Sequence, residues 1–109
     1  MANIQINWTP YSPDPGDVDS VELYRSTTIN NEEAFQTALD NGTAGAPIAT
    51  FTDITVASTH TDLSVSADTY YYCLAAKNSG GYNVGADTPT TVIPAAGDVS
   101  GAVACVTVS

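Results

Sequence analysis

The stretch DTYYYCLAAKNSGG, residues 68–81, places three consecutive tyrosines before a cysteine, a run of small apolar residues and a polar, glycine-rich end. On an extended strand, alternate side chains point to opposite faces. One face then carries a set that tapers from large to small, namely Tyr70, Tyr72, Leu74 and Ala76. A tyrosine at the start of such a strand can pack its ring inside and direct its hydroxyl back to the connecting backbone. The pattern predicts a long core strand with an architectural role.

Short runs of Val, Ile, Thr and Tyr, separated by Pro, Gly, Asn and Asp, recur along the chain at spacings typical of an all-β sandwich. In residues 3–10, Trp8 shares the predicted inner face with two isoleucines, and the strand ends at a proline. In residues 20–28, Leu23 is expected to face the core and Tyr24 the outside. Further strands are predicted at residues 46–51, 60–65, 88–93 and 101–109.

One segment, residues 31–40, departs from strand chemistry. Asn31 is a favourable N-cap, acidic residues occupy the first turn, apolar residues recur at helical spacing, and Gly42 follows as a terminator. The segment predicts a short amphipathic helix inserted between two strands.

Size and charge limit the classes of function. The 109 residues fit a single domain, 1–109, with one core. Twelve acidic residues face only two basic ones, Arg25 and Lys77, which gives a formal charge of -10. This charge repels phosphate backbones and anionic lipids, so we expect no nucleic acid and no membrane partner. The N-terminus has no pattern of a signal peptide, so we expect synthesis in the cytoplasm.

Residues 60–81, HTDLSVSADTYYYCLAAKNSGG, resemble the later half of a fibronectin type III domain of the kind found in bacterial and phage proteins. INWTP and VELYRSTT resemble two strands of the earlier half. The matching positions in the later half are Val65, Thr69, Tyr70, Leu74, Ala76, Asn78 and Gly81. The resemblance covers residues 3–93 and implies an immunoglobulin-like β-sandwich with an inserted helix.

The two ends of the chain depart from that family. Only three residues precede Ile4, so strand A of the family is expected to be absent. Residues 95–109 extend beyond the family's last strand, and their AVACVTV run is apolar on both faces, as in a covered strand. We expect this C-terminal strand to pair with a sheet edge. The alternatives are the edge of the 3–10 strand in the same chain and an edge in a neighbouring copy, which would give a homo-oligomer by strand exchange.

Candidate reactive residues are few. His60 has no identifiable nucleophile or orienting partner and is expected to replace an aromatic residue in a strand. The aspartates of residues 14–19 lack the spacing of a calcium loop. Glu32 and Glu33 are neighbours on a helix, so their carboxylates diverge and cannot flank one glycosidic bond. We therefore predict no catalytic, cofactor-binding or metal-binding residue and no enzymatic activity.

The two cysteines, Cys73 and Cys105, are expected to be free. Neither has a basic neighbour or a histidine partner that would activate the thiol. A disulfide would require the C-terminal strand to lie beside the 68–81 strand, which pairing with the 3–10 strand does not give.

Tyrosines give the best sequence signal for binding. Tyr11, Tyr24, Tyr71 and Tyr82 are expected on loops or outer faces, where they could stack on a sugar or a protein partner.

These observations predict a non-enzymatic structural or interaction module. By resemblance, it is an accessory component of a bacteriophage virion, as capsid decoration or a tail or neck protein, assembled in the host cytoplasm with other virion proteins. The alternative is a carbohydrate- or receptor-binding module that recognises a cell-surface glycan, as part of a secreted hydrolase.

Deletion of residues 95–109 is expected to expose apolar surface and promote aggregation, because the C-terminal strand covers a sheet edge. Size-exclusion chromatography and thermal unfolding of the truncated chain check this expectation. A monomeric truncation product as stable as the full chain would contradict it.

Overall fold

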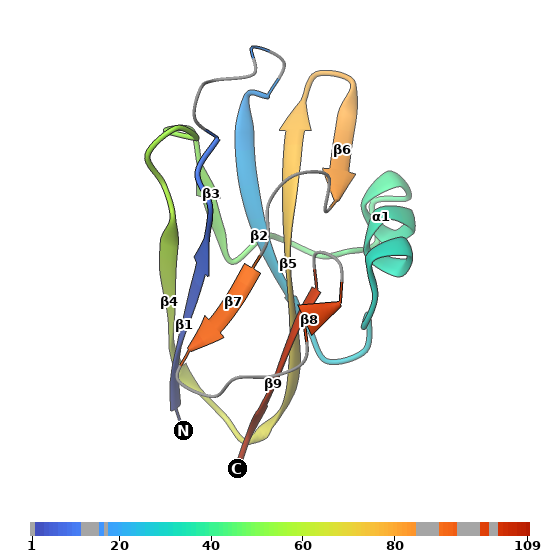
Figure 1. The fold of residues 1–109 in the computed structure, drawn as a ribbon. Helices are drawn as coiled ribbons and strands as arrows, with labels where there is room; N and C mark the ends of the chain where they lie inside the picture. The colour runs from blue at the N-terminus through green and yellow to red at the C-terminus, as the bar shows by residue number, and fades with distance from the viewer. Residues whose placement is uncertain (1, 12–15, 17, 85–89, 94–98, 101–102) are drawn as a thin grey trace.

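The computed structural model describes residues 2–11, 16, 18–84, 90–93, 99–100 and 103–109. Two antiparallel sheets pack face to face in an all-β, immunoglobulin-like sandwich, and one short helix lies outside the larger sheet (Figure 1). Among the described residues, no helix combines the length and apolar character that a membrane span requires. The fold class predicted from strand chemistry is confirmed.

The smaller sheet has three strands. Its central strand is β1 (Ala2–Trp8), which pairs with β4 (Thr59–Val65) on one side and β7 (Thr90–Ile93) on the other. Along β1 the burial alternates, since Ile4, Ile6 and Trp8 face the core and the residues between them are more exposed. This alternation is typical of a sheet with one wet face.

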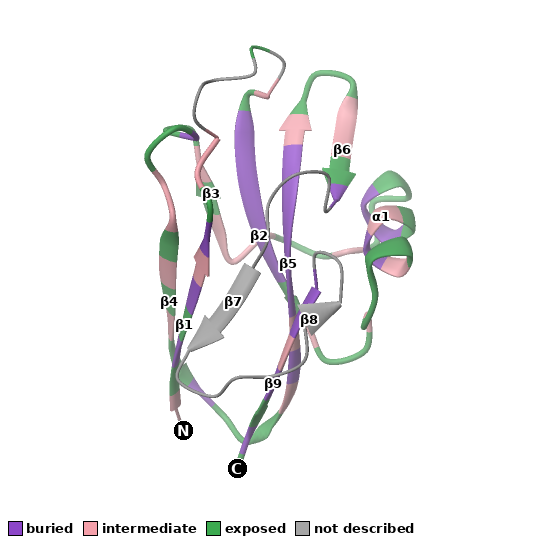
Figure 2. Ribbon diagram, viewed as in Figure 1, coloured by how far each residue is buried: buried purple, intermediate pink, exposed green. Residues whose placement is uncertain are grey.

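The larger sheet is built around β5 (Asp68–Asn78). On one side β5 pairs with β2 (Ser20–Ser26), which in turn pairs with β3 (Ala49–Phe51). On the other side it pairs with both β6 (Gly81–Val84) and β9 (Val103–Val108), and β8 (Val99–Ser100) pairs with β9. Figure 2 shows that buried residues dominate the two central strands, β2 and β5.

The main core lies between the sheets. The six side chains predicted for it are all buried. Five of them belong to the main core cluster, namely Trp8, Leu23, Tyr70, Tyr72 and Leu74, whereas Ala76 is buried outside it. β9 adds Ala104, Val106 and Val108 to the same cluster. The C-terminal segment is therefore part of the core, and the core does not end at Ile93.

The Tyr70 hydroxyl confirms the predicted use of this tyrosine. Its ring is buried in the main core, and its hydroxyl donates a hydrogen bond to the backbone carbonyl of Ser66, at 2.9 Å. Ser66 lies in the turn between β4 and β5. The bond therefore fixes the crossing from one sheet to the other, as a tyrosine corner does in immunoglobulin-like folds.

A polar contact also joins the two sheets. Arg25 of β2 forms an ion pair with Asp62 of β4, at 2.7 Å, and the Tyr72 hydroxyl donates to the same carboxylate oxygen, at 2.8 Å. Burial alone lowers the pKa of Arg25, but the hydrogen bond and charge of Asp62 outweigh it and raise the pKa overall. Burial and the Asp62 carboxylate raise the pKa of Tyr72, so this hydroxyl stays a donor.

The predicted helix forms α1 (Glu32–Asp40), inserted between β2 and β3. The side chain of Asn31 caps it by accepting from the backbone N–H of Ala34 at 2.8 Å. Its apolar face covers the outer side of the larger sheet and encloses a second, smaller core. The buried members of this core are Tyr24, Phe35, Leu39, Cys73, Ala75, Val84 and Val103.

The C-terminal strand pairs with a strand of the same chain, which was one of the two predicted alternatives, but the expected partner strand within the chain is wrong. The C-terminal strand β9 does not pair with β1; it pairs with β5, from Asp68↔Val108 to Cys73↔Val103. Within the predicted 88–93 strand, expected to be the last strand of the family pattern, residues 90–93 form β7, which pairs with the free side of β1. The physical reason is geometric, because β6 already pairs with the far half of β5, from Ala75 to Asn78, and leaves the near half open for β9.

β6 and β9 are thus two halves of one interrupted strand that runs antiparallel to β5. Between them the chain crosses to the other sheet, contributes β7 and returns. The side of β1 that does not pair with β4 is therefore paired with a segment from inside the chain. The structure places the C-terminal pairing within one chain and needs no neighbouring copy for it.

Replacement of Tyr70 by Phe is expected to lower the free energy of unfolding by about 1 kcal/mol, because the Ser66 carbonyl loses its partner while the ring stays in place. Urea unfolding of Tyr70→Phe measures the loss. Tyr71→Phe is the matched control, since its hydroxyl has no hydrogen bond to any residue that the structure describes. Equal stability of Tyr70→Phe and the wild type would contradict this role.

Candidate functional site

The four tyrosines predicted to be exposed do not form one surface. Tyr11 is half-buried against the main core, whereas Tyr71 and Tyr82 are half-buried against the second core. The expectation for Tyr24 is wrong, because only 2% of it is exposed. Its side chain does leave the outer face of the sheet, but α1 covers that face. Strand periodicity predicts on which face of the sheet a residue lies, but it does not predict whether another element covers that face.

Tyr24 belongs to a polar cluster on this covered face. Its hydroxyl donates to the carboxylate of Glu22, a residue that is only 7% exposed. Lys77 lies 3.8 Å from the other Glu22 oxygen and sits over the ring of Tyr82. Burial, followed by the hydrogen bonds to Glu22 and Tyr82, raises the pKa of Tyr24, so it remains neutral. The cluster satisfies a buried carboxylate and has a structural role.

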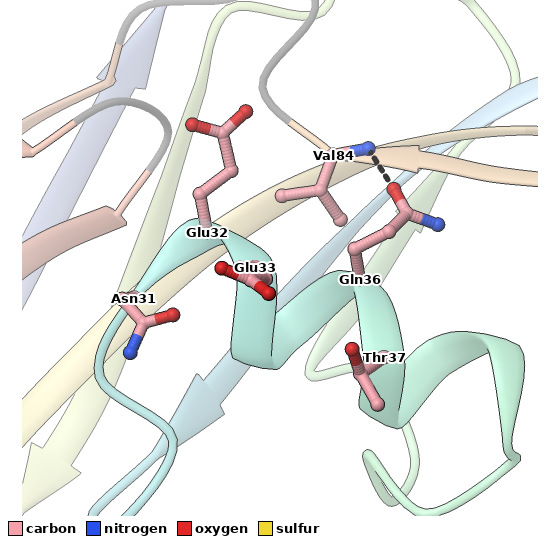
Figure 3. Close-up of a pocket in the computed structure, with 6 residues that line it drawn as sticks. All are labelled: Asn31, Glu32, Glu33, Gln36, Thr37 and Val84. Carbon is pink, nitrogen blue, oxygen red and sulfur yellow. Dashed lines mark hydrogen bonds between the residues drawn. The ribbon is translucent and has the colours of Figure 1, made fainter.

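An open depression of about 600 Å³ lies between α1 and β6 (Figure 3). Its lining residues are Asn31, Glu32, Glu33, Gln36, Thr37 and Val84. The Gln36 side-chain amide accepts from the Val84 N–H at 2.9 Å and donates to the Tyr82 carbonyl at 3.0 Å. A side chain thus takes the place that a further strand would occupy beside β6. The two hydrogen bonds of Gln36 at this depression therefore attach α1 to β6 of the larger sheet.

The carboxylates of the depression are not arranged for catalysis. Figure 3 shows that the side chains of Glu32 and Glu33 leave the helix in different directions, as their adjacent positions require. Among the residues that the structure describes, no three His, Cys, Asp or Glu side chains are grouped to hold a metal ion. Of the aspartates in residues 14–19, Asp14 and Asp17 lie outside the described residues.

His60 faces the inside of the sandwich from β4. Its ring meets the ring of Phe51 edge-on, with centroids 6.0 Å apart, and Phe51 in turn contacts Trp8 at 5.2 Å. His60 therefore fills an aromatic position between the sheets, which is the role that the sequence predicts for it.

Both cysteines are free thiols. Cys73 is buried in the second core, and burial, with a smaller contribution from the charge of Glu32, raises the pKa of its thiol to about 12. Contrary to the expected separation, Cys105 lies on the strand next to Cys73, opposite Tyr71. The two cysteines are offset by two residues along the paired strands, so they are diagonal rather than direct neighbours.

Among the described strands, the longest unpaired edge is the outer edge of β4. The four strands that end the two sheets are β4, β7, β3 and β8, and β4, with seven residues, is the longest of them. No described strand pairs with its outer edge. β6 also has a side without a neighbouring strand, but the Gln36 side chain already forms hydrogen bonds with the backbone there.

The register of β4 shows which backbone groups face outward. Trp8 N–H donates to the Ser58 carbonyl at 2.9 Å, so the Trp8–Ser58 position is a hydrogen-bonded pair of the antiparallel ladder. Because such pairs alternate with open ones, the N–H and C=O groups of Thr59 and Thr61 point away from β1. The edge therefore offers donors and acceptors at two alternate residues.

A β-bulge ends this open stretch. Ala2 pairs with Val65 and Ile4 with Asp62, so Leu63 and Ser64 together face the single residue between Ala2 and Ile4. Ser64 has a φ of 56°, and its N–H is bonded to the Asn3 side chain at 3.1 Å. Bulges terminate regular pairing at sheet edges. The pairable edge is therefore residues 59–62, which we call the β4 edge.

Exposed apolar side chains lie at the end of the β4 edge and in the loop before it. Leu63 is 66% exposed, and Val56 is 71% exposed. The sequence predicts the strand but not its position at a sheet edge. The sequence did hold one sign of an exposed site, because the apolar Leu63 lies on the same strand face as the polar residues Thr59 and Thr61. Chemically, the β4 edge can add a strand from another molecule.

Comparison with protein-family models, with curated proteins and with solved structures found no match to this chain.

Alkylation of the native protein by iodoacetamide at about pH 8 is expected to modify Cys105 and leave Cys73 unmodified, because the Cys73 thiol is buried and protonated. Intact-mass measurement counts the modified thiols, and both should react in denaturant. Cys105→Ser is the control, in which the native protein should remain unmodified. Rapid native modification of Cys73 in that variant would contradict its buried position.

Proposed function

We propose that this chain is a non-enzymatic interaction module of the fibronectin type III kind, and that it serves as an accessory protein of a bacteriophage virion. The observation that carries the interaction role is the open β4 edge, with the outward N–H and C=O groups of Thr59 and Thr61. Edge strands are usually covered or blunted, so a pairable one on a compact domain is a natural docking element.

The sequence resemblance described above supports the proposed membership in the fibronectin type III family. The tyrosine that matches the family pattern, Tyr70, bonds the turn carbonyl before its strand, and Trp8 and Leu74 lie in the core between the sheets. These are positions where the pattern would place architectural residues. The virion role rests on this resemblance together with the docking edge.

The ionisable residues in the interior support a non-enzymatic role. Glu22 binds Tyr24 and Lys77, Asp62 binds Arg25 and Tyr72, and the Cys73 thiol is kept protonated by burial. A catalytic group needs access to a substrate and a suitable protonation state. These groups are instead used to hold strands together.

The charge distribution fits a protein that stays dispersed until it docks. Both basic side chains are engaged in ion pairs with acidic partners. The remaining acidic residues leave a net charge of -10, which opposes self-association.

Particles of a bacteriophage whose genome encodes this chain should contain the chain in a fixed ratio to the major structural protein. The isolated chain should be monomeric. Quantitative mass spectrometry of the particles and sedimentation of the pure chain make the two measurements. Absence of the chain from washed particles, or an amount that varies between preparations, would contradict the virion role.

A further inference from the structure

We infer that the β4 edge binds an extended, positively charged segment of a partner protein as an additional strand of the smaller sheet. This inference rests on the proposed function, since it assigns a partner chemistry to the same docking edge. It concerns the binding mode and the charge of the partner and does not depend on which assembly the partner belongs to.

The backbone geometry requires an extended partner. Thr59 and Thr61 are separated by one residue, so their outward groups repeat with the spacing of a β-strand. A helix satisfies its own backbone groups and cannot bond this row. The bulge at Leu63 and Ser64 limits the added strand to a few residues.

The surroundings of the β4 edge favour a partner strand with apolar residues at its centre. On the inner side, His60 and Phe51 present ring surface between the two sheets. At the end of the edge, Leu63 presents an exposed side chain on the outer face. A short strand gains little from hydrogen bonds alone, because those bonds replace bonds to water. Apolar contacts of this kind would supply the remaining stabilisation.

Charge complementarity selects a basic partner. The chain has twelve acidic residues and two basic ones. Both basic side chains are already paired: Arg25 of β2 with Asp62 of β4, and Lys77 with Glu22 in the larger sheet. A second copy would bring a like charge of -10 to the same edge, whereas lysine or arginine beside the added strand would be attracted and steered. The partner is therefore a basic segment rather than another copy.

The test uses the full chain and the synthetic peptide KKVTVTVKK, with EEVTVTVEE as the matched acidic control. The basic peptide should bind, and bind more weakly as salt is raised. Hydrogen exchange followed by NMR should slow at the Thr59 and Thr61 amides by about tenfold or more at saturation, because these amides become bonded. The acidic peptide should give no protection.

Two variants at one position separate strand addition from general charge attraction. Thr61→Pro removes an outward N–H without removing a bond to β1, and proline is tolerated at such edge positions. It should weaken binding of the basic peptide by about tenfold or more, equivalent to about 1.4 kcal/mol. Thr61→Val keeps the N–H and should bind within about twofold of the wild type. Thermal unfolding verifies that both variants are folded.

Several outcomes would overturn the inference. These are equal binding of the acidic peptide, binding without protection of the Thr59 and Thr61 amides, no binding of the basic peptide, and full binding by a folded Thr61→Pro variant. Dimerisation of the wild type that Thr61→Pro abolishes would identify a second copy as the occupant instead.

The two proposals fail separately. If the basic peptide binds as expected but the chain is absent from particles, strand addition stands and the virion role does not. If the chain is incorporated into particles and Thr61→Pro is incorporated equally well, the virion role stands and docking through the β4 edge does not.

Discussion

The rest of the structure depends on β5, the strand on which both cores are built. Its inner face supplies Tyr70, Tyr72 and Leu74 to the space between the sheets, and its outer face supplies Cys73 and Ala75 to the space beneath α1. Neighbouring strands pair with it on both sides along most of its length. The middle of β5, from Tyr72 to Ala76, is buried on both faces, so its apolar side chains stabilise the fold from both sides of the larger sheet.

The covering of β5 explains why polar groups lie where they do. α1 covers a face that alternation alone would leave in water, and it thereby buries Tyr24. Glu22, which lies on the same face, is buried as well. A buried carboxylate must be bonded, and Tyr24 and Lys77 provide the partners. Gln36 bonds the free side of β6, so the larger sheet is closed there by a side chain. The smaller sheet has no such cover along β4 among the described residues, so the backbone groups of the β4 edge remain open to a partner.

Local sequence patterns determine where most helices and strands form, whereas contacts between distant segments determine which strands pair with one another. The helix was predictable because Asn31 caps it and its apolar residues recur at helical spacing. The Tyr70 bond was predictable because its acceptor, Ser66, is four residues away. The partners of β7 and β9 were not predictable, since both strands have the right composition to cover either open position. The choice between the positions follows from where β6 leaves β5.

By itself, therefore, the sequence determined that the chain forms a two-sheet sandwich, which side chains of each strand share a face, and where the helix lies. Those properties follow from periods of two and of about 3.6 residues, which are local. Only the tertiary structure decided that Tyr24 is buried, that β9 completes the larger sheet, and that β4 ends the smaller one. The physical reason is that burial and edge position depend on which segments pack together across the chain, and strand alternation carries no information about that choice.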